Sequence, residues 1–392
     1  MTLIWYEWKK LWRYRSLIFI LLALLLLDIW KIYDTRQTSS YFVDSPEWEM
    51  AYWELYEEFK GEITESKAQS LVDLYQPIAD SVKDLTFNTA TDKNSLTGIN
   101  RFSDSLFLSR FYVTPMKRFY NYENTATEIA TKAQNNVEFF RSLGNTYEMQ
   151  KNARIYFLFK ERKIESFEYF ESYSRLVDHD FSSWLILVFC IYGLNYLISR
   201  EKESEMATLI STTFNGRNRT LIAKIVVCIF FIIFVVLSFS LTDWVAFLSI
   251  YHSTEGSSLP IYALLEFSES PLTLTLWQYM ILSICSKCIG MFSIGIACLL
   301  IAYRTRKSLI SLLLGLLCSC GFLFLATVCR LSDYGILKVL NPGSWLIPRT
   351  LFRDCSFCNI AGYPFLLWEA ALIVATAFCL FFTLSLFRRN QV

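Results

Sequence analysis

The sequence has little of what catalytic and metal-binding chains need. Only two of its 392 residues are histidines, His179 and His252, and neither lies in a His-Glu-x-x-His pattern. It has no Gly-x-x-x-x-Gly-Lys-[Ser/Thr] loop, so it cannot bind ATP in that mode, and no glycine-flanked serine elbow. We therefore expect no catalytic residue, no metal site and no cofactor.

Cysteine is absent from the long polar segment before Cys190, because all 11 cysteines lie at or after that residue. That segment therefore cannot be held together by disulfides. Most of the cysteines fall within apolar runs, where a thiol behaves as a small hydrophobic group. Cys355 and Cys358 lie between two such runs and allow two alternatives, a small disulfide or free thiols.

A large excess of charge of one sign is also lacking, since 37 basic and 36 acidic residues give a net charge of +1. This balance gives no indication of a nucleic-acid partner. By contrast, 54% of the residues are hydrophobic and 17% are aromatic, which indicates a membrane protein. Six runs are long enough to cross a hydrocarbon core of roughly 30 Å as helices. They are residues 16–33, 181–199, 221–242, 276–303, 308–329 and 363–387.

The first run could be a signal peptide or a retained membrane anchor. Basic residues precede a short leucine-rich stretch, as they do in a signal peptide. However, Asp28, Trp30 and Lys31 are charged or bulky where a peptidase needs small side chains. We therefore interpret the first run as a membrane span that stays in the protein.

The short loops carry basic residues unevenly, and this predicts the orientation. Residues 9–15 and 304–307 are rich in lysine and arginine, and residues 388–389 are both arginine. Residues 243–277 contain four acids and no lysine or arginine. Because short cytoplasmic loops carry the excess of lysine and arginine, we expect both termini in the cytoplasm and residues 243–277 outside.

With the N-terminus in the cytoplasm, the long segment 34–180 after the first span lies outside, and its pattern is helical. Pro46 suits the first position of a helix, aromatic residues recur at helical spacing after it, and Gly61 ends it. A second helical stretch runs roughly over residues 127–176, with an interruption near Gly144. The sequence thus predicts a mainly helical extracellular domain with an aromatic core.

The loop after the second span carries the clearest functional pattern. Met206, Leu209 and Ile210 form one apolar face among charged residues, which predicts a short amphipathic helix on the cytoplasmic side. Asn215 and Gly216 end it. Physical chemistry alone leaves two alternatives, a helix that lies on lipid headgroups and a helix that docks on a partner.

This loop resembles the coupling loop of type 2 ATP-binding-cassette (ABC) exporter permeases. The matching residues are Glu201, Glu203, Met206, Leu209, Ser211, Thr212, Gly216, Arg217 and Lys224. Similar positions elsewhere are Gly61 with Thr64, Asp180 before Phe-Ser, Gln278-Tyr279 with Lys287, and Leu340-Asn-Pro342. The chain departs from the family at Glu205, where relatives usually carry glycine, and it lacks a proline after Ser-Thr.

The resemblance implies that residues 200–220 form a coupling loop that seats in a groove on a separate ATPase. Within it, Glu201, Glu203, Met206, Leu209, Ser211, Thr212 and Arg217 would make the coupling contacts. The implied partners are ABC ATPase subunits, a second permease subunit in a homodimer or heterodimer, and the lipid of a bacterial cell membrane. The N-terminal tryptophans Trp5, Trp8 and Trp12, interleaved with basic residues, predict an interfacial helix beside this loop.

Lys287 lies near the middle of the fourth run. A charge at the bilayer centre costs about 2.5 to 3.5 kcal/mol on insertion scales, so we expect its side chain to face protein or water. Asp28, Asp243 and Glu369 lie near the outer ends of other spans and are candidate partners. Lys287 would either form a structural ion pair or snorkel, or else line a translocation path.

Taken together, the sequence predicts an all-α integral membrane protein. Its parts are an interfacial helix and first span (residues 1–33), an extracellular helical domain (34–180) and a five-span domain with the coupling loop (181–392). The expected function is the permease subunit of an ABC exporter that moves a peptide or lipid outward; it is not itself an enzyme. The alternative is an ATPase-driven mechanical or sensory protein acting through its extracellular domain, a class that usually has four spans.

Overall fold

The structure is a computed structural model that describes residues 2–13, 15–39, 46–83, 95–203, 216–251, 253–305, 307–330 and 335–391. It is almost entirely helical. The helices are α1 (Thr2–Trp12), α2 (Arg15–Ser39), α4 (Pro46–Phe59), α5 (Glu65–Lys83), α6 (Arg101–Leu108), α7 (Thr114–Ser142), α8 (Thr146–Phe159), α9 (Glu171–Asp178), α10 (Phe181–Glu203), α12 (Gly216–Ile250), α13 (Leu276–Arg304), α14 (Ser308–Arg330), α15 (Gly335–Leu340), α16 (Arg349–Phe352) and α17 (Leu367–Gln391). Two short antiparallel ribbons pair β1 (Gly61–Glu62) with β2 (Ser166–Phe167) and β3 (Phe357–Ile360) with β4 (Tyr363–Leu366).

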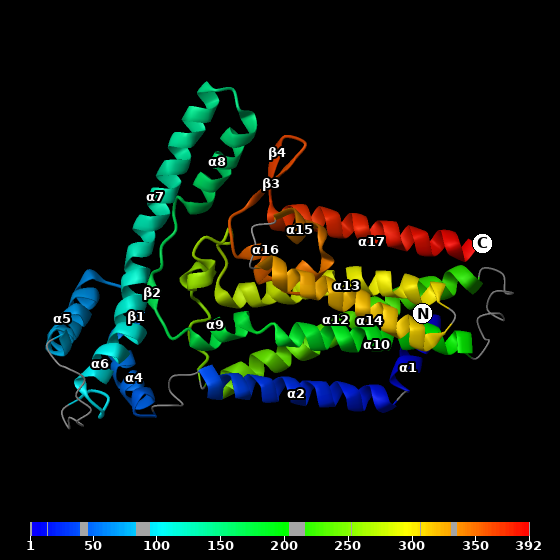
Figure 1. The fold of residues 1–392 in the computed structure, drawn as a ribbon, viewed down its shortest axis with the longest axis horizontal. Coiled ribbons are helices and arrows are strands. Elements are labelled where there is room, and N and C mark those ends of the chain that lie inside the picture. Colours follow the sequence, from blue (N-terminus) through cyan, green and yellow to red (C-terminus); the bar gives the residue numbers. More distant parts are fainter. Residues whose placement is uncertain are drawn as a thin grey trace.

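Within the described residues, six helices are long and apolar enough to cross a membrane. They are α2, α10, α12, α13, α14 and α17, one for each predicted run. These helices lie side by side in one bundle (Figure 1). The predicted fold class is confirmed, and the chain is a multi-pass membrane protein.

The predicted start of the last span was wrong. Residues 363–366 form strand β4, which pairs with β3, and helix α17 begins only at Leu367. The backbone at Ala361 and Gly362 has positive φ angles of 54° and 84°. A two-residue turn with both φ angles positive matches the twist of a β-hairpin, so the chain reverses here before it enters the span.

Residues 46–178 form a head domain at one end of the bundle, and both termini lie toward the other end (Figure 1). Helix α4 has the predicted limits, and Gly61 after it has a φ of 90°. The predicted interruption near Gly144 is also present, with a φ of 68° between α7 and α8. The second helical stretch does not continue through residue 176 as predicted, because β2 separates α8 from α9.

The head domain has an aromatic core that continues into the bundle. Trp48, Tyr52 and Tyr56 of α4 are buried and pack against Phe107 and Tyr112. The same cluster includes buried side chains from α12, from the 251–275 connection, from α13 and from the segment before α17. One hydrophobic core therefore crosses residue 180, where the sequence had suggested a domain boundary.

Hydrogen bonds strengthen this continuity. The hydroxyl of Tyr122 donates to the Ser268 carbonyl at 2.8 Å. The guanidinium of Arg162 donates to the Ser270 carbonyl at 2.7 Å. Both acceptors lie in the connection between α12 and α13, so the head domain is fastened to a loop of the bundle.

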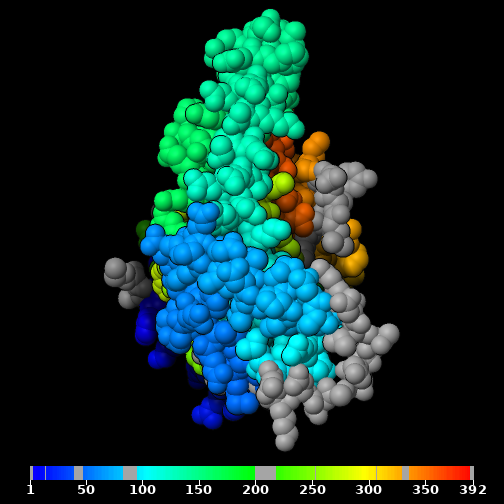
Figure 2. Space-filling model, turned by 90° about the vertical axis from the view of Figure 1, so that its left-hand side faces the viewer, coloured from blue at the N-terminus to red at the C-terminus, as the bar shows by residue number. Residues whose placement is uncertain are grey.

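The head domain also reaches the last span through α8. Figure 2 shows the head domain end on, with α4 and α5 in blue and α7 projecting beyond them. Arg154 of α8 pairs with Glu369 of α17 at 2.6 Å and donates to the Pro364 carbonyl at 2.7 Å. Because both side chains are about one-quarter exposed, this ion pair contributes little to the free energy of folding. Its main effect is to orient α8 relative to α17.

Residues 341–352 form a fully buried segment between α14 and α17. Asn341 caps a short turn by accepting from the Gly343 amide, and its own amide donates to the Phe322 carbonyl of α14 at 2.9 Å. Buried serines supply donors to other carbonyls of this segment: Ser183 to Leu346, Ser286 to Trp345 and Ser270 to Phe352, each at 2.7 Å. These bonds satisfy backbone groups that a regular helix would satisfy internally.

Helix α1 packs one face on the bundle at the end away from the head domain. The rings of Trp12 and Phe234 lie 5.0 Å apart between their centroids, and Leu11 is buried. Trp5 and Tyr6 are exposed. This arrangement is the one expected of an interfacial helix, with its second face free for lipid headgroups.

Candidate functional site

The head domain joins the bundle through three residues, Asp178, His179 and Asp180, between α9 and α10. His179 has an extended backbone (φ −79°, ψ 91°). Successive side chains of an extended segment point to opposite sides. The side chains of Asp178 and Asp180 therefore lie on one side of the joint, and the side chain of His179 lies on the other. Each side makes its own polar contacts with the bundle.

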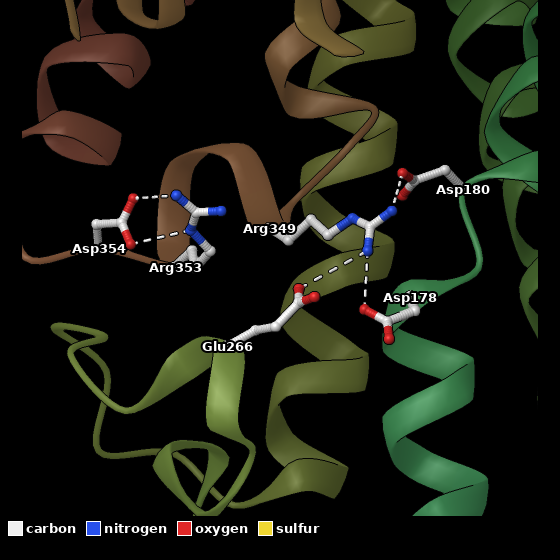
Figure 3. Close-up of polar contacts among 6 residues, drawn as sticks. All are labelled: Asp178, Asp180, Glu266, Arg349, Arg353 and Asp354. Carbon is white, nitrogen blue, oxygen red and sulfur yellow. Dashed lines mark hydrogen bonds and ion pairs between the residues drawn. The ribbon is translucent and has the colours of Figure 1, made fainter. Parts of the chain in front are cut away.

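On the first side the partner is Arg349 of α16 (Figure 3). Its guanidinium binds Asp178 at 2.8 Å, makes a second hydrogen bond to Asp180, and lies 3.9 Å from Glu266. The Arg349 side chain is only 6% exposed. Burying a guanidinium is costly unless it is paired, and here carboxylates from the joint and from the 251–275 connection supply the pairing.

On the second side the ring of His179 meets carboxylates from two spans. His179 Nε2 lies 3.0 Å from Asp28 Oδ1 of α2. Asp243 of α12 is also close. One side-chain nitrogen or oxygen atom from each of the three residues lies within 4.8 Å of those of the other two. Both aspartates are buried, at 0% and 3% exposure.

Lys287 of α13 completes this group of charges. Its ammonium donates to Ser182 Oγ at 3.2 Å and acts electrostatically on both Asp28 and Asp243. The side chain is buried, so the prediction that it faces protein is confirmed. The structure brings it together with two of its three candidate partners.

Glu369 was the wrong candidate partner for Lys287. It binds Arg154 and accepts from the Leu366 amide at 2.9 Å. Arg154 lies on α8, a helix whose position over the last span could not be read from the sequence.

Burial lowers the pKa of His179 below its ordinary value. Asp243 and Asp180 act in the opposite direction, while Lys287 and Lys31 add to the lowering. At neutral pH the imidazole is therefore neutral, so one ring nitrogen keeps its lone pair.

A small cavity of about 20 Å³ adjoins the charges. His179, Asp243 and Lys287 line it, together with Ser240 of α12 and Tyr279 of α13. A space of this size holds about one water molecule. The cavity thus has room for one small ligand beside the carboxylates of Asp180 and Asp243, the imidazole of His179 and the ammonium of Lys287.

The coupling contacts expected from the resemblance fall largely outside the described residues. Met206, Leu209, Ser211 and Thr212 belong to 204–215, which the structure does not describe. Glu201 and Glu203 lie at the end of α10, and Arg217 lies at the start of α12. Their roles remain predictions.

Cys355 and Cys358 are free thiols in the structure. Cys355 packs against the aromatic core, whereas Cys358 lies on β3 and packs against a separate small cluster beside α17. The two side chains thus contact different clusters, and no bond joins them in the structure. Burial raises the pKa of the Cys355 thiol to about 11, so it is not a reactive thiolate.

Sequence reasoning missed two members of the site. Arg349 had a signal, since it is a lone arginine in the apolar run Trp-Leu-Ile-Pro-Arg-Thr-Leu-Phe. His179 was considered only as a catalytic residue and set aside. Its aspartate neighbours in the chain gave a hint of a charged joint, but Asp28 and Asp243 are far from it in sequence.

No protein-family model matches this chain, and no curated protein matches it. The functional argument therefore depends on the residues themselves and on how the structure places them.

Proposed function

We propose that this protein is the membrane subunit of an ABC exporter, which couples ATP hydrolysis by separate ATPase subunits to outward movement of a substrate. One observation carries most of the support. Helix α10 runs without interruption from the charged joint at Asp180 to Glu203, which lies within the proposed coupling loop. At 1.5 Å per residue it spans about 35 Å, the thickness of a membrane. A displacement of the coupling loop would therefore be transmitted along α10 to the joint.

In this proposal the protein works in a bacterial cell membrane, with the head domain outside and both termini in the cytoplasm. The basic residues of the short loops support this orientation. The partners are two ATPase subunits and a second permease subunit, and the substrate is a peptide or a lipid.

A mechanical or sensory protein is the second candidate. The shared core and the Arg349 ion pairs clamp the head domain to the bundle, as force transmission would require. The six candidate spans among the described residues favour the exporter, since the mechanical class usually has four. A transport assay in proteoliposomes with the co-purified ATPase distinguishes the two, because only an exporter accumulates substrate.

We predict that Met206→Asp combined with Leu209→Asp uncouples the complex. Buried anchor residues at an interface contribute about 2 kcal/mol or more each, so losing one weakens binding at least about thirtyfold. The measurements are co-purification of the ATPase and substrate-stimulated ATP hydrolysis. The matched control is Ser204→Asp with Thr208→Asp, which adds the same charge to the opposite face of the predicted helix. If the two double variants behave alike, the loop is not a docking helix.

We predict that Ser81→Cys reacts with a membrane-impermeant maleimide in intact cells, whereas Asn215→Cys reacts only after the cells are opened. Ser81 belongs to α5 of the head domain, and Asn215 belongs to the coupling loop. Labelling is counted above that of the parent chain, which has cysteines of its own. The reverse pattern would invert the topology and place the head domain in the cytoplasm.

A further inference from the structure

Three side chains converge from separate parts of the chain beside the joint. Asp28 comes from the first span, His179 from the joint and Asp243 from the third span. The nitrogen and oxygen atoms that could bind an ion all lie within 4.8 Å of one another. Two carboxylates and an imidazole are ligands that divalent transition metals accept, and zinc uses them in three-ligand sites.

Two carboxylate oxygens in this group accept no hydrogen bond from a donor group. Asp28 Oδ2 and Asp243 Oδ1 are buried, and within the described part of the chain the closest polar interaction is between the two carboxyl groups themselves. A buried carboxylate oxygen without a donor is costly, because it has lost its hydrogen bonds to water, and Lys287 acts on it only through its charge. A cation between them would supply the missing interaction.

The spacing suits a small metal ion. Metal bonds of 2.0 to 2.2 Å in a tetrahedron place ligand atoms about 3.3 to 3.6 Å apart. His179 Nε2 and Asp28 Oδ1 are already 3.0 Å apart, and a carboxylate oxygen of Asp243 lies within 4.8 Å of the ligand atoms of both residues. Calcium and magnesium fit less well, since they prefer six or more oxygen ligands.

The adjoining cavity provides a fourth position. It has room for about one water, and Lys287 lines it. Carboxylates bind a metal in the ionised form, and two ionised carboxylates with one ammonium together carry a charge of −1. A divalent ion with a hydroxide or another anionic ligand in the cavity brings the total to zero, which a low-dielectric site favours.

We propose that Asp28, His179 and Asp243 bind a divalent transition-metal ion of the zinc class, with its fourth position open to the cavity beside Lys287. The ion would pin the joint of the head domain to the first and third spans. This inference does not depend on the exporter proposal, since it concerns only groups within this chain.

The test is metal binding by the full chain, purified in detergent with a tag that contains no histidine. Metal analysis after addition of zinc and gel filtration should give about one zinc per chain. His179→Gln and Asp243→Asn should lose this zinc. His252→Gln, which removes the only other histidine, and Lys287→Met should retain it. Equal zinc contents in His179→Gln and His252→Gln would overturn the proposal.

X-ray absorption at the zinc edge of the wild-type chain keeps the test decisive if a variant fails to fold. The expected spectrum has an imidazole and oxygen shell near 2.0 to 2.2 Å. A sulfur shell near 2.3 Å would place the zinc on cysteines and overturn the site, as would wild-type protein that binds no zinc.

Discussion

Replacing Asp178 and Asp180 together by asparagine should destabilise the protein by about 3 to 5 kcal/mol. The double change leaves the buried Arg349 guanidinium with only Glu266, 3.9 Å away, as a charged partner among those described for it. Removing the acids from a buried pair costs more than the pair contributed, because the remaining charge cannot recover its water. The measurement is the thermal midpoint of the detergent-purified protein, followed by gel filtration.

Arg353→Met is the matched control for this prediction. Arg353 pairs with Asp354 through hydrogen bonds of 2.9 and 3.0 Å in the same region, but both side chains are about one-third exposed (Figure 3). An exposed pair contributes about 1 kcal/mol or less. Adding Arg349→Met to the double asparagine variant should restore part of the lost stability, because it removes the stranded charge. Equal losses for Arg353→Met and the double variant would contradict this view of the joint.

Gly343→Ala should be the most disruptive single methyl group added to the buried segment 341–352. A β-carbon at Gly343 would overlap the backbone of Phe322, with its carbonyl carbon only 2.7 Å away. Backbone of a packed helix cannot give way as a side-chain tip can, so we expect a loss of about 3 kcal/mol, at the upper end of overpacking costs. The nearby bond from Asn341 to the Phe322 carbonyl would also be strained.

Gly321→Ala provides the comparison, because it adds the same methyl group to α14 one residue before Phe322. Nothing lies within 4 Å of a β-carbon there. Its thermal midpoint should equal that of the wild type or exceed it slightly, since alanine favours helix over glycine. Should Gly343→Ala be as stable as Gly321→Ala, the close approach of the segment to α14 would not be a real constraint.

The spans could be predicted because hydrocarbon imposes a strong and simple requirement. A backbone in lipid must satisfy itself over about 20 residues, so length and hydropathy suffice to find each helix. The head helix α4 could be predicted for a similar reason, since proline, an aromatic stripe and a glycine mark its start, face and end. These signals are all local.

The site could be predicted only in part, because its members are far apart in sequence. The cost of a buried ammonium correctly singled out Lys287 and suggested Asp28 and Asp243 as partners. The same reasoning could not exclude Glu369 as a partner of Lys287. Its actual partner, Arg154, belongs to the head domain, and no sequence pattern predicts that the head domain packs against the last span. The buried segment 341–352 also escaped prediction, because its carbonyls are satisfied by serines on other elements.

The shared core has a consequence for how this protein can vary. A head domain with its own core could be deleted or exchanged between relatives without harm to the spans. Here, residues 46–178 share one buried cluster with Phe247, Tyr279 and Phe352, which belong to the bundle and its connections, so their deletion would remove a large part of that core. The head domain and the bundle therefore fold around one shared core. A chimera that carries this head domain on the bundle of another protein will fold only if the 251–275 and 341–352 connections are transferred with it.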